Sequence, residues 1–174
     1  MVVKNFSAVA ADEESLRRLR DAFGAFATGV AVITTRSAAG LPIGVTVNSF
    51  ASLSLDPPLV MWALNAGSPS LAAFQEARCF AVNVLATSQA EVAARFASRV
   101  PQKFAGIECF EGGRGLPLIA GCLAHLECRL RAEHEGGDHA LFVGEVERFA
   151  HHPGFAPLIF HRGVYCALHS SPGA

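Results

Sequence analysis

Residues 41–58 read Leu-Pro-Ile-Gly-Val-Thr-Val-Asn-Ser-Phe-Ala-Ser-Leu-Ser-Leu-Asp-Pro-Pro, a run that combines a strand pattern with many neutral polar groups. In its first half, aliphatic residues alternate with polar ones, so an extended backbone sends the two kinds to opposite faces. Pro57 and Pro58 cannot donate backbone hydrogen bonds and should end the segment. The polar residues are Thr46, Asn48, Ser49, Ser52 and Ser54. They fit a ligand site, and they fit equally well a half-exposed strand whose hydroxyl groups lie on its solvent-exposed face.

Outside residues 41–58, the sequence predicts three helices. Asp12 is suited to cap a helix to about residue 26, whose apolar stripe should be buried. Ser68, followed by Pro69, should cap a short helix to residue 76, and Ser88 a helix to residue 97. The stripe of the first helix consists of Leu16, Leu19, Phe23 and Phe26.

The remaining segments read mostly as strands. Residues 135–138 have the composition of a hairpin turn. Residues 99–118 are rich in Gly and Pro and should form a long loop that serves the site. Strands are expected at 30–36, 43–49, 59–64, 79–85, 122–133, 139–150, 158–160 and 164–168. Many hairpin-connected strands with few, peripheral helices indicate a mainly β fold, a closed or nearly closed barrel.

Length and composition predict one domain covering residues 1–174, with a core at about 12–169 and a frayed tail at 170–174. A formal charge of −1 and a pI of about 6.6 show no excess of positive charge, so a nucleic acid partner is not expected. No apolar run approaches the ~18 residues of a membrane span. The apolar fraction of 51% is nevertheless high, which predicts a subunit interface and a homodimer.

The cysteines indicate a reducing compartment. They are Cys79, Cys109, Cys122, Cys128 and Cys166, an odd set without a Cys-x-x-Cys pair. Reduced thiols, together with an N-terminus that lacks an apolar segment, predict a cytoplasmic protein. In a strand His125 would point away from Cys122 and Cys128, so no metal site is expected there.

The pattern Thr-x-Asn-Ser-Phe-x-Ser-x-Ser-x-Asp-Pro-Pro at 46–58 resembles the signature of the flavin reductase family, the small reductase partners of two-component flavin-dependent monooxygenases. The resemblance continues at 68–71, 80–85, 103–104, 137–139 and 161–165. It implies a flavin-reductase-like, FMN-binding split β-barrel that forms dimers. The implied activity is NADH- or NADPH-dependent reduction of free FMN or FAD, which supplies reduced flavin to a monooxygenase.

The resemblance also implies a flavin site. The ribityl chain and phosphate are expected at Thr46, Val47, Asn48, Ser49, Ser52, Ser54, Ser68 and Ser70. The ring is expected at Asn83, Val84 and Leu85, with Gln89, Phe96 and Phe104 nearby. Simple helix capping explains the two serines of the helix start equally well, and core packing is the alternative for both phenylalanines.

The residue expected to be catalytic is His139. Gly137-Asp138-His139 matches the family motif, and the resemblance places this histidine beside the nicotinamide, where it orients the dinucleotide or relays a proton. A surface imidazole in a turn is the alternative. Arg162 and Tyr165 are expected to contact the dinucleotide, although a structural ion pair is an equal alternative for Arg162.

Two other functions are possible on the same barrel. One is a non-catalytic flavin- or haem-binding module, and the other is a pyridoxamine-phosphate-oxidase-like enzyme. The second should carry a basic phosphate clamp, which the serine-rich run lacks. Neither a Gly-x-Gly-x-x-Gly turn after a strand nor a Gly-Lys-[Ser/Thr] phosphate loop is present.

In the expected dimer, Trp62 or the helix of Phe96 should contribute to the partner's pocket.

Overall fold

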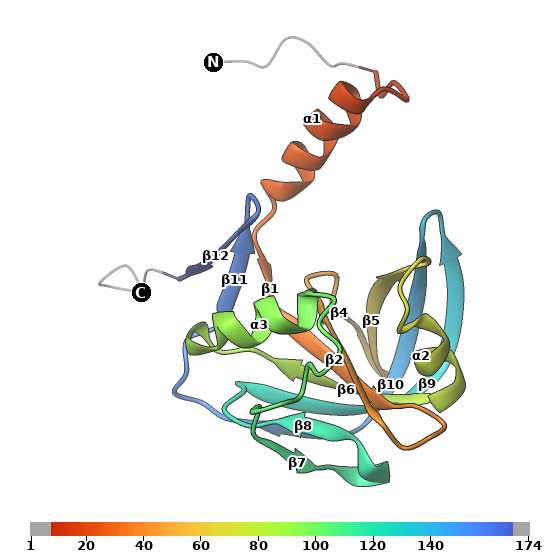
Figure 1. Ribbon diagram of the computed structural model, residues 1–174, viewed down its shortest axis with the longest axis vertical. Helices are drawn as coiled ribbons and strands as arrows, with labels where there is room; N and C mark the ends of the chain where they lie inside the picture. The colour runs from red at the N-terminus through yellow and green to blue at the C-terminus, as the bar shows by residue number, and fades with distance from the viewer. Residues whose placement is uncertain (1–7, 169–174) are drawn as a thin grey trace.

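The computed structural model describes residues 8–168, so the predicted frayed tail lies outside the described residues. The chain runs through α1 (Glu13–Gly24), β1 (Thr28–Gly29), β2 (Ala31–Arg36), β3 (Pro42–Val47), β4 (Ala51–Leu55), β5 (Pro58–Asn65), α2 (Leu71–Ala77), β6 (Cys79–Val84), η1 (Thr87–Gln89), α3 (Ala90–Ala97), β7 (Cys109–Glu111), η2 (Gly113–Gly115), β8 (Pro117–Ile119), β9 (Ala124–Gly136), β10 (His139–His151), β11 (Leu158–His161) and β12 (Val164–Ala167). The mainly β prediction with peripheral helices is confirmed (Figure 1).

Seven antiparallel strands form the main sheet, in the order β3-β2-β6-β9-β10-β5-β4. Its two edge strands, β3 and β4, are consecutive in the chain and are joined by only residues 48–50. The sheet must therefore curl until its edges approach each other. No ladder joins β3 to β4 within the described part of the chain, so the barrel is split rather than closed. Residues 42–55 thus form two strands at opposite edges of the sheet, separated by residues 48–50.

Two smaller sheets flank the main one. Strands β1, β11 and β12 form a three-stranded sheet beside α1, and β7 pairs with β8. Strand β7 and most of β8 lie within residues 99–118, so the long loop predicted there contains a short two-stranded ribbon. Pro117 carries a backbone oxygen that accepts the hydroxyl hydrogen of buried Thr34 at 2.5 Å, which ties the ribbon to β2. A buried polar anchor of this kind leaves no periodic signal in the sequence.

The core is built around aromatic rings inside the curled sheet. Trp62 on β5 stacks on Phe142 of β10, with ring centroids 4.5 Å apart and planes 11° from parallel. Phe74 of α2 and Phe80 of β6 meet the same indole edge-on. Trp62 is 0% exposed and Phe96 is 1% exposed. Trp62 is therefore out of a partner's reach, and that expectation was wrong for Trp62; a contribution from exposed residues of the helix that contains Phe96 stays a prediction.

Helix α1 projects from the body of the molecule (Figure 1). Asp12 caps it as predicted, its carboxylate accepting the Ser15 backbone N–H at 2.8 Å. None of the helical residues is buried in this chain, however, and Phe23 and Phe26 are 69% and 77% exposed. The predicted burial of the apolar stripe is absent because no other segment of residues 8–168 packs over it.

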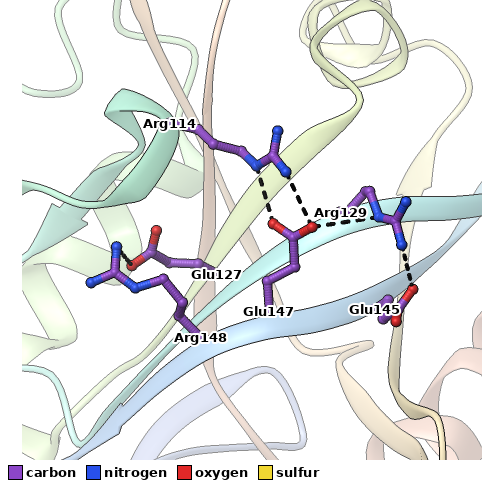
Figure 2. A network of polar contacts seen from close by, with 6 residues as sticks. All are labelled: Arg114, Glu127, Arg129, Glu145, Glu147 and Arg148. Carbon is purple, nitrogen blue, oxygen red and sulfur yellow. Dashed lines mark hydrogen bonds and ion pairs between the residues drawn. The ribbon is translucent and has the colours of Figure 1, made fainter.

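An ion-pair network fastens the η2 turn to the long β9–β10 hairpin (Figure 2). Arg114 donates two hydrogen bonds of 3.1 Å to the two carboxylate oxygens of Glu147, which also pairs with Arg129 at 3.4 Å. Arg129 continues the network to Glu145 at 2.9 Å. Because these side chains are partly solvated, each ion pair alone contributes little to the free energy of unfolding. The carboxylates that are shared between two arginines link the pairs into one network.

Among the described residues, no helix is long and apolar enough to span a membrane.

Candidate functional site

Three segments that are distant in sequence meet at the end of β5. Asn65 pairs with His139 at the start of β10, and Ala63 pairs with Leu141. The Ala66 backbone N–H donates to the carbonyl oxygen of Asp138 at 2.8 Å. The Ser49 hydroxyl donates to the Ala63 carbonyl at 3.1 Å and accepts from the Ala63 N–H at 3.0 Å. The link after β3, the segment after β5 and the β9–β10 turn are thus held together.

The outer face of β5 and β10 adds an apolar stripe to this junction. Paired positions on antiparallel strands share a face of the sheet. Along both strands, inner positions are buried while alternate outer positions are half-buried. The half-buried stripe consists of Met61, Ala63, Leu141 and Val143, and it ends at the exposed pair Asn65 and His139. Apolar groups next to a few polar ones are the composition expected where a heteroaromatic ring binds.

The imidazole of His139 contacts the carboxylate of its neighbour Asp138. Its Nδ1 lies 2.7 Å from an Asp138 carboxylate oxygen, and the imidazole side chain is 44% exposed. The hydrogen bond to His139, followed by the charge interaction with it, lowers the pKa of Asp138. The carboxylate is therefore ionised around neutral pH and can only accept the hydrogen bond.

Some of the predicted flavin-binding residues are buried or hydrogen-bonded within the chain, and others are exposed to a ligand. Thr46 donates its hydroxyl hydrogen to the Ala93 carbonyl of α3 at 2.7 Å. Ser54 accepts the Asp56 N–H at 3.2 Å. Val47 is buried in the core. By contrast, Asn48 and Ser52 are exposed, with no side-chain hydrogen-bond partner in residues 8–168.

The predicted start of the second helix was wrong by two residues. Helix α2 begins at Leu71, and its N-cap is Ser70, whose side chain makes no capping bond. The Ser68 hydroxyl instead accepts the Ser70 N–H at 3.3 Å, within a turn. The Ser68 N–H donates to the Asn65 carbonyl at 2.9 Å, which keeps this turn against the His139 end of the sheet.

Asn83 is fully committed inside the core. It is 0% exposed, and its amide nitrogen donates to the Val32 carbonyl at 2.9 Å and the Thr34 hydroxyl at 3.1 Å. Its amide oxygen accepts the Ile119 N–H at 2.8 Å. The side-chain contact with a flavin ring that we predicted is unavailable in this geometry. An Asn in an apolar strand signals a buried polar group, and the sequence does not tell a ligand contact from a strand anchor.

The other predicted ring contacts are also mostly internal. Leu85 is 0% exposed, and Val84 is half-buried against the core. Gln89 is 8% exposed, and its amide accepts from Ala86 N–H at 2.9 Å and donates to the Ala120 carbonyl at 2.8 Å. Gln89 thus closes the turn before α3, which begins at Ala90 rather than after Ser88. Buried Phe96 meets half-buried Phe104 edge-on, with centroids 4.8 Å apart.

Sequence reasoning assigned no role to Lys103, which the structure places between α3 and β3. Its ammonium group donates to the Phe96 carbonyl at 2.8 Å and to the Gly44 carbonyl at 3.3 Å. It therefore joins the loop after α3 to the C-terminal end of that helix and to β3. Desolvation by partial burial lowers the pKa of Lys103. Its place beside Phe104 in the family pattern was the only signal.

Arg162 and Tyr165 lie in the other sheet. Arg162, in the β11–β12 turn, has φ of 49° and donates its backbone N–H to Gly24 at 2.9 Å. Tyr165 packs on Phe160, with ring centroids 5.6 Å apart. The β11–β12 hairpin and the tip of the β9–β10 hairpin lie on opposite sides of the molecule in Figure 1. Within one chain, these two residues are not brought to His139.

Two surface hollows lie outside this junction. One of about 520 Å³ is lined by Ala94, Arg95, Ser98, Val100, Pro101 and Gln102. Another of about 270 Å³ is lined by Arg36, Pro42, Phe104, Ile107, Cys109, Phe110, Glu111 and Pro117. Neither is lined by His139, Asn48 or Ser49. The junction around His139 is an open surface whose polar groups are mostly neutral, and these groups fit a flavin with its polyhydroxyl chain.

Comparison with known proteins connects this arrangement to a family. A family model described as "Flavin reductase like domain" matches residues 23–169. The chain is 45% identical over 161 residues to the reductase subunit HsaB of a flavin-dependent monooxygenase from Rhodococcus jostii, covering 92% of this chain and 82% of that protein. It is 47% identical over 152 residues to the FMN reductase (NADH) SmoA of Agrobacterium fabrum, covering 87% and 86%.

Solved structures agree. Nitrilotriacetate monooxygenase component B from Mycobacterium thermoresistibile superposes with a TM-score of 0.88 at 40% identity, covering 94% of each chain. The Streptomyces globisporus NADH:FAD oxidoreductase SgcE6, in complex with NAD and FAD fragments, has a TM-score of 0.85 at 36% identity, covering 96% of this chain and 99% of that one. By its sequence and by its split-barrel fold, the chain belongs to the flavin reductase family.

Proposed function

We propose that the protein is an NAD(P)H:flavin oxidoreductase that reduces free FMN or FAD and supplies reduced flavin to a partner monooxygenase. The observation that carries this proposal is the meeting of His139, the neutral groups of residues 48–52 and an apolar stripe at one end of β5. Relatives named as monooxygenase reductase subunits and as an NADH-dependent FMN reductase support the same activity.

Different residues of the junction are assigned to the flavin and to the dinucleotide. We assign the flavin's hydroxylated chain and phosphate to Asn48, Ser49, Ser52 and the turn of Ser68 and Ser70. The flavin, when bound, accepts a hydride from the reduced nicotinamide, a transfer that needs alignment and no protein nucleophile. His139 orients the dinucleotide at the end of the stripe. Packing supports the site through the buried residues Val47, Asn83, Leu85, Gln89 and Phe96 and through the half-buried residues Thr46, Val84 and Phe104.

Neutral binding groups suit a flavin that must leave after reduction. Charge-assisted hydrogen bonds are roughly twice as strong as neutral ones and would slow release. Of the residues assigned to the flavin, all donate or accept through hydroxyl, amide or backbone groups. A reductase that supplies a separate monooxygenase therefore gains from this composition.

The alternative functions are less well supported. A non-catalytic flavin- or haem-binding module does not account for relatives at 45% and 47% identity that are named as reductases. A pyridoxamine-phosphate-oxidase-like enzyme needs a cationic phosphate clamp, and the junction around Ser49 presents neutral groups.

We propose further that two copies form a homodimer through the exposed apolar face of α1. A helix of 12 residues is marginal in water on its own, so one that packs on nothing in its own chain calls for a covering surface. Dinucleotide contacts by Arg162 and Tyr165 would then have to come from the second copy.

All five cysteines are unpaired, which supports a cytoplasmic location.

Steady-state turnover tests the activity. Purified protein is mixed with NADH or NADPH and an excess of FMN or FAD, and loss of the reduced nicotinamide absorbance is followed. We expect many turnovers per protomer with at least one flavin and one nicotinamide. Stoichiometric ligand retention without turnover in any of the four mixtures would reject a reductase in favour of a binding module.

A further inference from the structure

The β9–β10 turn holds the backbone of His139 on two sides. His139 pairs with Gly136 of β9 and with Asn65 of β5. The preceding residue is held as well, because the Ala66 N–H donates to the Asp138 carbonyl at 2.8 Å. The Cα position of His139 is therefore set by main-chain bonds. The remaining freedom lies in the imidazole ring, which is 44% exposed and can rotate and exchange tautomers.

Asp138 removes that freedom. Its carboxylate lies 2.7 Å from the imidazole Nδ1, and an ionised carboxylate can only accept a hydrogen bond. The proton must therefore be on Nδ1, which leaves Nε2 as the nitrogen that is free to meet a ligand. A neutral imidazole then presents an acceptor at Nε2, and a protonated one presents a donor.

We propose that Asp138 is a positioning residue, which fixes the Nδ1–H tautomer and the ring orientation of His139 so that Nε2 faces the bound dinucleotide. This inference rests on the role proposed above for His139. Asp138 itself touches no substrate in this scheme and acts through the imidazole. The Asp138→Ala substitution isolates the carboxylate, because the main-chain bond from Ala66 does not involve the side chain.

The direct test is spectroscopic. Imidazole nitrogen shifts are recorded by NMR on ¹⁵N-labelled protein at about pH 9, where histidine is neutral, and the His139 signals are assigned by their loss in His139→Ala. We expect the Nδ1–H tautomer in the wild type and a shift toward Nε2–H in Asp138→Ala. An Nε2–H tautomer in the wild type, or the same tautomer in both proteins, overturns the proposal whatever the enzyme does.

The kinetic test asks whether Asp138 acts through His139. Asp138→Ala should lower kcat/KM for the nicotinamide about tenfold or more, since small misplacements of an orienting group have effects of this size. In a His139→Ala background the same substitution should have no further effect. The matched control is Glu135→Ala, which removes the same charge from an exposed position in the same hairpin.

The outcomes separate the two proposals. If His139→Ala impairs turnover while Asp138→Ala does not, or if the two losses add in the double variant, the positioning role is wrong and the proposed function is untouched. If His139→Ala leaves turnover unchanged, the role assigned to His139 fails, and the positioning role fails with it. Thermal unfolding of each variant identifies any loss that arises from the fold.

Discussion

At the scale of single residues, the structure separates groups that contact each other from groups available to a ligand. Asn83 and Asn48 show the difference. Both are amides in or beside an apolar strand, yet Asn83 is buried with its amide fully hydrogen-bonded and Asn48 is exposed. The sequence pattern is the same for both, because the distinction depends on strand partners distant in the chain. Residue-level assignments from sequence therefore mixed residues that are buried and hydrogen-bonded within the fold with residues that are exposed to a ligand.

The role of His139 leads to a kinetic prediction. His139→Ala should impair the nicotinamide-dependent step and leave flavin affinity within about threefold, because the imidazole is assigned to the dinucleotide side of the stack. Flavin affinity is measured by fluorescence titration and hydride transfer by single-turnover kinetics. A collapse of flavin affinity with intact hydride transfer at saturating flavin would show that the assignment is wrong.

A close approach at Gly44 leads to a stability prediction. A Cβ added there would lie 2.5 Å from Cε1 of Phe96, well inside contact distance. Gly44→Ala should therefore push α3 away from β3 and cost about 1–3 kcal/mol of unfolding free energy, as overpacked cores do. The control is Gly29→Ala, where an added Cβ meets nothing within 4 Å. Urea denaturation should show a lower midpoint for the first variant only, and equal midpoints would refute the steric account.

Buried His125 predicts a pH dependence of stability. Desolvation lowers its pKa from the ordinary 6.5, with its Nε2 held by the Ile119 carbonyl at 2.8 Å and Nδ1 buried without a partner among the described residues. The unfolded chain thus binds this proton more readily than the native one, so stability should fall as pH drops below about 6.5.

Urea midpoints at two pH values measure this effect. Between about pH 7.5 and pH 5.5, on either side of the ordinary histidine pKa, the midpoint of the wild type should fall more than that of His125→Gln, which cannot titrate. His151→Gln, at an exposed position on β10, serves as the control. Parallel slopes for wild type and His125→Gln would mean that this histidine does not carry the acid sensitivity.

At the scale of elements, local sequence patterns predicted the positions of most strands. They did not predict which strands pair with each other. The alternation in residues 43–47 and the hairpin composition at 135–138 are local, and the structure has β3 and the β9–β10 hairpin there. The opposite-edge positions of β3 and β4 depend on the closure of the whole sheet. The β7–β8 ribbon escaped detection because its strands are short and lie among glycines.

Helix α1 leads to an element-scale prediction. The double substitution Phe23→Ser and Phe26→Ser should convert the proposed dimer to a monomer, because these are the most exposed large apolar side chains of the helical segment. Light scattering at micromolar concentration should give a mass of twice 18.3 kDa for the wild type and 18.3 kDa for the variant. Asp21→Ser, on the opposite face of the helix, should stay dimeric. A monomeric wild type would reject the dimer.

At the scale of the whole molecule, the curled sheet serves to bring the ends of distant strands to one place. Seven strands pair so that the link after β3, the end of β5 and the start of β10 meet, although they are separated by many residues in the chain. The polar groups of this junction are mostly neutral and its apolar stripe is open. These features fit the proposed role of the junction, which is to hold a flavin during reduction and then release it.

The measurement that tests this account most directly is the fate of the reduced flavin. Under anaerobic conditions, a small amount of protein is mixed with excess free flavin and reduced nicotinamide, and the protein is removed by ultrafiltration. We predict reduced flavin in the filtrate in large molar excess over the protein, since each protomer reduces and releases many flavins. Reduced flavin that stays with the protein, at no more than one per protomer, would contradict the account.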